Sequence, residues 1–406
     1  MLGGGMVPGG VVLLAGEPGI GKSTLVLQLL DSMGRSGQRC LMITGEESLQ
    51  QVSLRGKRLG IDPQGFSVAS GTSLPDIVHV CSVNTYDMVI IDSIQTLSDP
   101  ELGSAAGTPT QVRDCAAALI ALAKTSGTAL VLVGHVTKDG NVAGPKTLEH
   151  MVDTVVTLEG ERSGTLRLLR AAKNRFGSCE ETGVFVMEQH GLETVDDPSS
   201  MLLADRRLGV PGSILYPGIE GTRPLMSEIQ ALVTPAPDPA TAKRICTGID
   251  HKRIAMLLGV LSERVGIRLG SCDVFVAAAG GIAVKEPAVD LAVALALVSA
   301  HSKTACPPGV VAFGEIGLGG EVRRVPSTPR RLSEAARMGA TTALVPAGSR
   351  EKRQGSLDVV EVEDLSHALA VLEHDAKPSG ARDARARGHD GRVTLVERPV
   401  PLLGTR

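Results

Sequence analysis

The sequence predicts an α/β protein in which a nucleotide-binding unit is followed by a second α/β unit. Three observations predict this. A glycine-rich phosphate loop stands between an apolar run and a helical stretch. Strand-like apolar runs alternate with helical stretches from residue 11 to about 195. The same alternation resumes after residues 194–212, which are rich in turn formers. Such alternation is typical of mainly parallel sheets covered by helices.

The phosphate loop has the pattern G-x-x-x-x-G-K-[ST] and follows the apolar run Val11–Ala15. A strand that turns into a helix through glycines points consecutive backbone N–H groups at one spot, where phosphate binds. We expect Lys22 to reach the β- and γ-phosphates of ATP, and Ser23 to hold Mg²⁺. The alternative is a glycine-rich turn that only resembles the motif. The expected nucleotide-binding residues are Gly16, Glu17, Pro18, Gly19, Ile20, Gly21, Lys22, Ser23 and Thr24.

Acidic residues end two further strands. Asp92, at the end of Met88–Asp92, has the position of a second Mg²⁺-organising acid, although it could be an ordinary strand-end aspartate. Glu46 and Glu47 follow the strand Cys40–Thr44. Ligands bind in the crevice where such strands end, so we favour Glu46 as the base that orients water. The alternative is that both residues form the acidic start of the next helix, and we assign Glu47 there.

His135 follows the strand Ala129–Val133. A polar group at this place can sense the γ-phosphate and pass its state to the loop Thr137–Pro145, or it can be an ordinary hydrogen-bonded histidine.

The remaining elements are expected from periodicity. The helices are expected at Thr24–Leu30, Ser48–Gly60, Thr110–Ser126, Arg253–Val265, Val289–Ser299 and Pro329–Met338. The further strands are expected at Thr154–Leu158, Thr165–Ala171, Gly183–Glu188, Ser213–Tyr216, Leu225–Val233, Val274–Ala278, Val310–Phe313 and Ala343–Pro346.

Composition excludes several classes of protein. The 406 residues carry a net charge of −3, so any nucleic-acid contact must use local basic loops. Aromatic residues make up only 2%, which argues against a base-stacking platform. The seven scattered cysteines include no Cys-x-x-Cys pair and suit free thiols in a reducing cytoplasm. We find no leader and no apolar run long enough to span a membrane, and expect a cytoplasmic protein.

Several segments together resemble the bacterial RadA (Sms) family of RecA-like DNA-repair ATPases. The most specific is Lys173–Gly177, with the sequence Lys-Asn-Arg-Phe-Gly. The others are Leu2–Gly9, Gly16–Thr24, Thr44–Ser48, Ile91–Thr96, Gly134–Lys138 and Leu148–Asp153. The resemblance implies a hexameric, DNA-stimulated, helicase-like ATPase. Such proteins act with a RecA-type recombinase on single-stranded or branched DNA and promote branch migration.

The resemblance also assigns candidate residues for assembly and for DNA. Lys173 and Arg175 would reach the γ-phosphate of a neighbouring subunit, as an arginine finger does. Alternatively they contact DNA phosphates or only solvate a turn. Two glycine-rich loops, Asp99–Thr110 and Thr137–Thr147, would face the channel of the ring. The available phosphate partners are Lys138, Lys146 and Arg113.

Residues 200–374 resemble the peptidase domain of Lon, through Gly280–Ala300 and Gly314–Val322. Ala288 stands where the nucleophilic serine belongs and Pro329 where the lysine belongs, so no Ser–Lys dyad is expected. The predicted fold is a RecA-like P-loop NTPase domain followed by an inactive Lon-like domain. An ATP-dependent peptidase and a nucleotide-gated scaffold remain alternatives. Three pairs could supply a basic surface, or could only solvate exposed helices: Lys252 and Arg253, Arg323 and Arg324, and Arg330 and Arg331.

The predicted division is 1–195 for the ATPase domain, 196–212 for a linker, 213–374 for the Lon-like domain and 375–406 for a disordered tail. Members of the resembled family usually begin with a four-cysteine zinc finger, and this sequence starts after the point where the finger would end. Zinc is therefore not expected in this chain.

Overall fold

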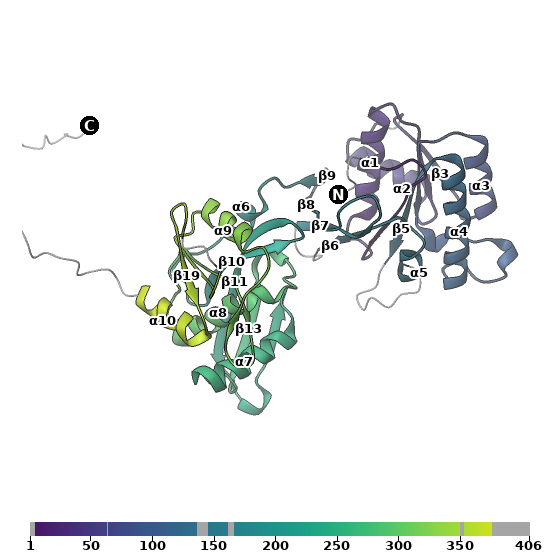
Figure 1. The fold of residues 1–406 in the computed structure, drawn as a ribbon. Coiled ribbons are helices and arrows are strands. Elements are labelled where there is room, and N and C mark those ends of the chain that lie inside the picture. Colours follow the sequence, from purple (N-terminus) through teal and green to yellow (C-terminus); the bar gives the residue numbers. More distant parts are fainter. Residues whose placement is uncertain (1–4, 63, 136–144, 161–165, 350–352, 376–406) are drawn as a thin grey trace, which may run out of the picture.

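The computed structural model describes residues 5–62, 64–135, 145–160, 166–349 and 353–375. These residues form two α/β parts, each built on one large sheet, and the four strands β6–β9 lie between the two groups of helices (Figure 1). The predicted fold class is confirmed. No helix within the described ranges has both the length and the apolar character needed to cross a membrane.

The first part is a nine-stranded sheet of order β3-β2-β4-β5-β1-β6-β7-β8-β9. The strands from β3 to β6 in this order are parallel, and β7, β8 and β9 return antiparallel as a meander. The strands are β1 (Val11–Gly16), β2 (Cys40–Thr44), β3 (Ser67–Ser70), β4 (Met88–Asp92), β5 (Ala129–His135), β6 (Thr154–Glu159), β7 (Leu166–Asn174), β8 (Thr182–Glu188) and β9 (Gly191–Thr194).

Helices cover both faces of this sheet, because the central strands are apolar on both sides. The core of one face takes its helical residues from α1 and α2, and that of the other from α3 and α4. Because the strands from β3 to β6 are parallel, their carboxyl ends meet at one open edge of the sheet, where ligands bind in such sheets. The helices are α1 (Lys22–Arg35), α2 (Leu49–Arg58), α3 (Leu74–Val83), α4 (Pro109–Ser126) and α5 (Pro145–Glu149).

The second part is an eight-stranded mixed sheet of order β12-β13-β11-β10-β14-β17-β19-β18. Its strands are β10 (Ser213–Glu220), β11 (Arg223–Pro235), β12 (Arg244–Thr247), β13 (Cys272–Ala278), β14 (Val310–Ala312), β17 (Thr342–Pro346), β18 (Arg353–Gln354) and β19 (Leu357–Val362). A separate ribbon joins β15 (Glu315–Ile316) to β16 (Val322–Arg323). The helices are α6 (Pro198–Leu203), α7 (His251–Val265), α8 (Asp290–Ser302), α9 (Thr328–Arg337) and α10 (Leu365–Asp375). Helix α8 is apolar on all sides and is almost wholly buried.

The two parts are joined by shared apolar and ionic contacts. A small apolar cluster combines Leu166 and Val184 of the meander with Leu225 of β11. Beside it, Arg170 of β7 donates to Glu220 of β10 at 2.5 Å and also to Glu159. The meander therefore extends the nine-stranded sheet and also contacts the second sheet.

Several elements differ from the sequence expectations. The residues predicted as a linker contain α6, which packs on β11 and whose Ser199 hydroxyl donates to Glu334 at 2.5 Å. Strands β3, β9, β12, β18 and β19 and helices α3 and α10 were not predicted, because most are short or half-exposed and carry weak periodicity. The predicted tail lies outside the described residues beyond 375.

Candidate active site

The phosphate loop lies between β1 and α1, as the motif predicts. Gly19 and Gly21 have φ of +79° and +118°, conformations that favour glycine, and a Cβ at Gly19 would meet no atom within 4 Å. Helix α1 begins at Lys22, so its first N–H groups face the loop. Lys22 is 4% exposed, and its ammonium donates to the carbonyls of Gly16 at 2.8 Å and Glu17 at 3.0 Å.

Asp92 ends β4 beside the start of α1 and accepts a hydrogen bond from Ser23. It is 6% exposed, and this burial raises the pKa of its carboxyl. A carboxylate and a hydroxyl side by side are the hard oxygen ligands that Mg²⁺ takes together with substrate phosphates. The donor set therefore fits Mg²⁺ bound with a nucleotide. No group of three or more His, Cys, Asp or Glu side chains among the described residues could hold a metal ion by itself.

A hydrogen-bonded chain connects the loop lysine to Glu46. The Lys22 Nζ lies 3.0 Å from Nδ1 of His135, and His135 Nε2 lies 2.8 Å from Oε1 of Glu46. Because an ammonium group only donates, Nδ1 accepts and the ring proton sits on Nε2, which donates to Glu46. The Ser93 hydroxyl donates to the same carboxylate oxygen. The chain thus fixes the tautomer of His135 and the orientation of Glu46.

The ionisation of these groups follows from burial and from their partners. Burial lowers the pKa of Lys22 to about 8, against the opposing charges of Asp92 and Glu46. Burial alone would raise the pKa of Glu46, but the hydrogen bond from Ser93, the neighbouring His135 and the charge of Lys22 bring it below its ordinary value. At neutral pH the site therefore holds an ammonium and a carboxylate joined through an imidazole.

Glu47 is directed away from this chain. Its carboxylate pairs with Arg55 of α2 at 2.5 Å, and its backbone N–H donates to the Thr44 hydroxyl. Helix α2 is capped by Ser48, whose side chain accepts from Gln51. Of the two adjacent glutamates, only Glu46 contacts the His135 chain in the structure.

Sequence reasoning missed three polar side chains at this edge. Ser93 holds Glu46, and Gln95 donates to the backbone carbonyl of His135 at 3.4 Å. Both lie within three residues after Asp92, and polar residues close behind a strand-end acid are the signal that could have found them. Arg167 of β7 donates to the backbone of the phosphate loop, and its signal is a charge between apolar residues at the start of the strand.

Lys173 and Arg175 contact the segment between α5 and β6 of their own chain. Lys173 lies within β7, one residue before its end, and it donates to the carbonyls of Glu149 at 2.6 Å and Val152 at 2.8 Å. Arg175 is half-exposed and pairs with Asp153 at 3.0 Å. Asp153 in turn accepts from the backbone N–H of Val11. Among the described residues of one subunit, neither cation contacts Lys22, His135 or Glu46.

The expected DNA contacts are only partly described. Arg113 lies on α4, half-exposed, and pairs with its neighbour Asp114 at 2.8 Å. Lys138 lies outside the described residues. Lys146 belongs to α5, but its side chain lies outside the described part of the structure. The stretch Asp99–Thr110 contains a short 3₁₀ turn before α4 begins at Pro109.

The second part has no nucleophile at the position that the Lon resemblance indicates. Ala288 is 1% exposed, and its carbonyl accepts from the backbone N–H of Gly314 at 2.8 Å. Pro329 lies in the first turn of α9. Between these segments Arg331, 1% exposed, pairs with Glu286 at 2.5 Å. The expectation that Arg331 adds to a basic surface is wrong, because its guanidinium is buried in this pair.

Three more of the expected surface cations are held by other groups. Arg253 pairs with the buried Asp290, and Arg330 donates to the carbonyl of Thr222 at 3.1 Å. Arg323 pairs with Glu321 at 2.5 Å on the ribbon. The predicted basic surface is therefore weaker than the sequence suggested.

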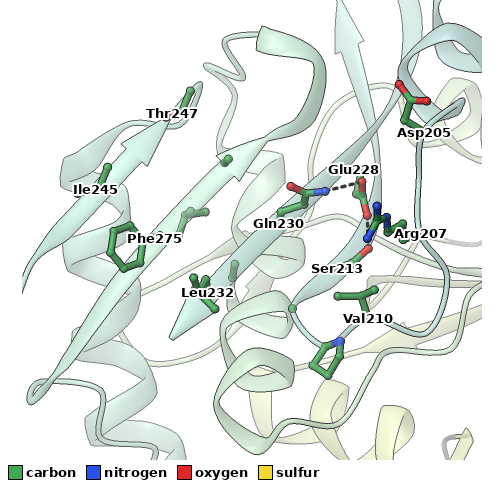
Figure 2. A pocket seen from close by; sticks show the side chains of 15 residues that line it. Asp205, Arg207, Val210, Ser213, Glu228, Gln230, Leu232, Ile245, Thr247 and Phe275 are labelled. Atoms are coloured by element: carbon green, nitrogen blue, oxygen red, sulfur yellow. Dashed lines mark hydrogen bonds between the residues drawn. The ribbon is translucent and has the colours of Figure 1, made fainter. Parts of the chain in front are cut away.

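A cavity of about 540 Å³ lies in the second part, lined by β10–β13 and the segment that leads into β10 (Figure 2). Its polar end holds Glu228, which accepts from Gln230 at 2.8 Å and from Ser213. Its apolar floor includes Leu232 and Phe275. All of its lining residues lie between 205 and 277, so it is separate from the phosphate loop.

The fold and the site define a class. A parallel sheet with β1 between β5 and β6, a phosphate loop leading into α1, and Asp92 at the end of β4 are the features of a P-loop ATPase. A family described as "AAA domain" matches residues 1–141.

The chain is also similar to curated proteins along most of its length. It is 45% identical over 377 residues to the "DNA repair protein RadA" of Halalkalibacterium halodurans, covering 91% of this chain and 81% of that protein. It is 44% identical over 371 residues to that of Bacillus subtilis, with coverages of 91% and 81%. It is 46% identical over 373 residues to that of Pseudomonas aeruginosa, with coverages of 92% and 82%. The chain belongs to the RadA family.

Proposed function

We propose that this chain is a DNA-stimulated ATP hydrolase of homologous recombination and DNA repair. In this proposal it forms a homo-oligomeric ring, hexameric as the family resemblance implies. The ring moves on single-stranded or branched DNA beside a RecA-type recombinase and promotes branch migration. The observation that carries the proposal is the hydrogen-bonded chain from Lys22 through His135 to Glu46, because it links the place of the γ-phosphate to the end of β5.

The chemistry follows from these residues. Mg²⁺, held by Ser23 and Asp92 together with the nucleotide, would offset phosphate charge. Lys22 would bind the β- and γ-phosphate oxygens, which can replace its neutral carbonyl partners. Glu46, ionised at neutral pH, would accept a proton from water as the water oxygen attacks the γ-phosphorus and the bond to the bridging oxygen breaks.

His135 would couple the nucleotide to DNA. When Lys22 turns to the γ-phosphate, the acceptor Nδ1 of His135 loses its donor, and the hold on Glu46 changes with it. His135 is the last residue of β5, and the candidate DNA loop Thr137–Thr147 follows it in the chain. Lys138, Lys146 and Arg113 are the proposed phosphate contacts of DNA.

Lys173 and Arg175 are proposed to act on a neighbouring subunit. In support, the half-exposed Arg175 directly follows β7 and pairs with Asp153, so its guanidinium can exchange Asp153 for an external phosphate. Mixed rings of Lys22→Ala and Arg175→Ala subunits, each inactive alone, should regain hydrolysis, because some interfaces then hold both groups. If verified mixed rings stay inactive at every ratio, the two cations act within one subunit or on DNA.

The experiment that tests the main proposal is ATP turnover with and without single-stranded DNA. A motor should hydrolyse ATP faster with DNA. A second assay, with branched DNA as the substrate, should show strand displacement. ATP binding that only sets oligomeric state, without DNA-dependent turnover, would favour the nucleotide-gated scaffold. ATP-dependent cleavage of unfolded casein, blocked by a serine-reactive probe, would instead favour the Lon-type peptidase, which Ala288 and Pro329 oppose.

A further inference from the structure

Strand β7 places a buried arginine behind the phosphate loop. Arg167 is 5% exposed, and its Nε donates to the backbone carbonyl of Ile20 at 3.0 Å. Its Nη1 donates to the carbonyl of Leu166 at 2.8 Å. Ile20 is the loop residue just before Gly21 and Lys22, so the contact falls where the phosphate groups of a nucleotide are bound.

The structure keeps room for this side chain. A Cβ at Gly160 would come within 2.9 Å of Cδ of Arg167, so a glycine at that place lets the guanidinium lie against the strand. Burying a guanidinium is costly, since it remains charged even where burial lowers its pKa. Such a cost is offset where the hydrogen bonds of the charge hold a backbone group in an orientation that a neutral side chain would not impose.

Arg167 holds the peptide group between Ile20 and Gly21 in one orientation. In a trans peptide the carbonyl and the following N–H point in opposite directions. Because Arg167 holds the carbonyl of Ile20, the N–H of Gly21 is directed to the opposite side of the loop. Gly21 has φ of +118°, a conformation that favours glycine, and a Cβ there would come within 2.6 Å of the Met187 side chain on β8.

We infer that Arg167 is a positioning residue for nucleotide binding: it orients the Ile20–Gly21 peptide so that the Gly21 N–H is presented to a phosphate oxygen. This inference rests on the proposed ATP site at the phosphate loop. Arg167 touches neither the nucleotide nor the attacking water and acts only through the loop. Lys22, by contrast, contacts the phosphates in the proposed mechanism.

The inference predicts a particular kinetic signature. The Gly21 N–H binds the phosphate in the ground state and in the transition state alike, and losing such uniform binding raises KM with kcat nearly unchanged. A hydrogen bond to a charged group changes affinity by about tenfold or more. Loss of Lys22 should instead remove kcat itself.

The experiment compares Arg167→Met, Arg167→Lys and the matched control Arg170→Met in the full chain. Arg170 lies on the same strand but donates to Glu159 and Glu220, away from the loop. ADP affinity is measured by calorimetry, ATP turnover gives KM and kcat, and thermal melting without nucleotide reports the fold. We expect Arg167→Met to weaken ADP binding about tenfold or more, with kcat within about threefold of wild type. Arg167→Lys should lie between, and Arg170→Met should bind ADP as wild type does.

A folded Arg167→Met protein that binds ADP as tightly as wild type would overturn the inference and leave Arg167 a packing residue. If Arg167→Met does not fold, Arg167→Lys decides: unchanged ADP affinity overturns the inference, and weakened affinity at unchanged kcat supports it. If wild type binds no ADP, the proposed nucleotide site itself is overturned, and the inference with it. The wild-type measurement thus separates the two failures.

Discussion

The phosphate loop and the segment around Ala288 are alike in outline, since each is a short turn that leads into a buried helix beside a cation. They differ in how the cation is held. Lys22 makes its three hydrogen bonds to two backbone carbonyls and to a neutral imidazole nitrogen. Arg331 makes two to the carboxylate of Glu286, at 2.9 and 2.5 Å, and others to the backbone carbonyls of Pro217 and Pro326.

This difference separates a site that waits for an anion from one that is already neutralised. Neutral acceptors can be exchanged for phosphate oxygens, which bring the missing negative charge. A carboxylate pair has no such deficit, and breaking it leaves a buried charge unpaired. The loop before α1 is therefore arranged for a ligand, whereas the corresponding place in the second part is arranged for packing.

The largest effect should come from Lys22→Ala. Loss of the ammonium removes the proposed contact to the γ-phosphate, and ATP hydrolysis should fall to background. The fold should survive, because the hydrogen-bond partners that Lys22 would leave are two backbone carbonyls and one imidazole nitrogen, not a carboxylate. Turnover and thermal melting should be measured together, and near-normal turnover would refute the assignment of the site.

Next comes Glu46→Gln, which keeps the shape of the side chain but cannot take a proton. We expect kcat to fall by about 10²–10⁴-fold while ADP affinity stays near wild type. Glu47→Gln is the matched control, since Glu47 pairs with Arg55 and not with His135. Equal losses in the two variants would mean that Glu46 has no special role.

For the second part, Arg331→Met should destabilise without touching turnover. It leaves the Glu286 carboxylate beside the buried Tyr216, and losing one partner of a buried pair costs about 3–5 kcal/mol. Arg330→Met, on the exposed side of α9, should cost about 0.5 kcal/mol or less. Denaturant unfolding gives both values. ATP turnover at low temperature should be unchanged in both variants. A loss of turnover in Arg331→Met alone would contradict the conclusion that Arg331 serves only packing.

The smallest effect is a pH dependence of ATP binding. With a pKa of about 8, Lys22 loses its proton as pH rises above 8, and ATP affinity should fall by up to about tenfold per pH unit. Without nucleotide, the effect of Lys22 on the stability of the fold has the opposite dependence on pH. The unfolded chain binds more protons between about pH 8 and 10.5, so this group makes the folded state relatively more stable as pH rises through that window.

Calorimetry from pH 7 to 9.5, in buffers of different ionisation enthalpy, would detect the proton taken up with ATP. Lys22→Arg, which stays charged throughout, should show a flat profile. A wild-type profile that is also flat would mean that the ammonium is not titrating in this range.

The sequence predicted the phosphate loop and the strands β2 and β4 to the residue, because an unbroken apolar run and a fixed motif leave little choice. It could also anticipate Asp92, since the acid directly ends its strand. It could not choose firmly between Glu46 and Glu47, because adjacent residues differ only in which way each side chain turns. That choice needs the positions of His135 and Arg55, which lie on other elements.

Long-range pairing explains the other misses. Nothing near Arg167 in the sequence indicates that β7 lies behind a loop more than a hundred residues earlier. Arg331 was expected at the surface because it stands beside another arginine, yet Glu286 buries it from 45 positions away. Charged residues in the core are thus the ones that sequence periodicity misplaces.

The apolar cluster of Leu166, Val184 and Leu225 has a consequence for how this chain can be divided. A cut between the two sheets would expose these side chains and would separate Arg170 from Glu220. Each half would then carry an exposed apolar patch, and Glu220 would lose its pairing with Arg170, which would still contact Glu159. The two sheets therefore share part of one interior, and separating them would destabilise the side chains on both sides of this contact.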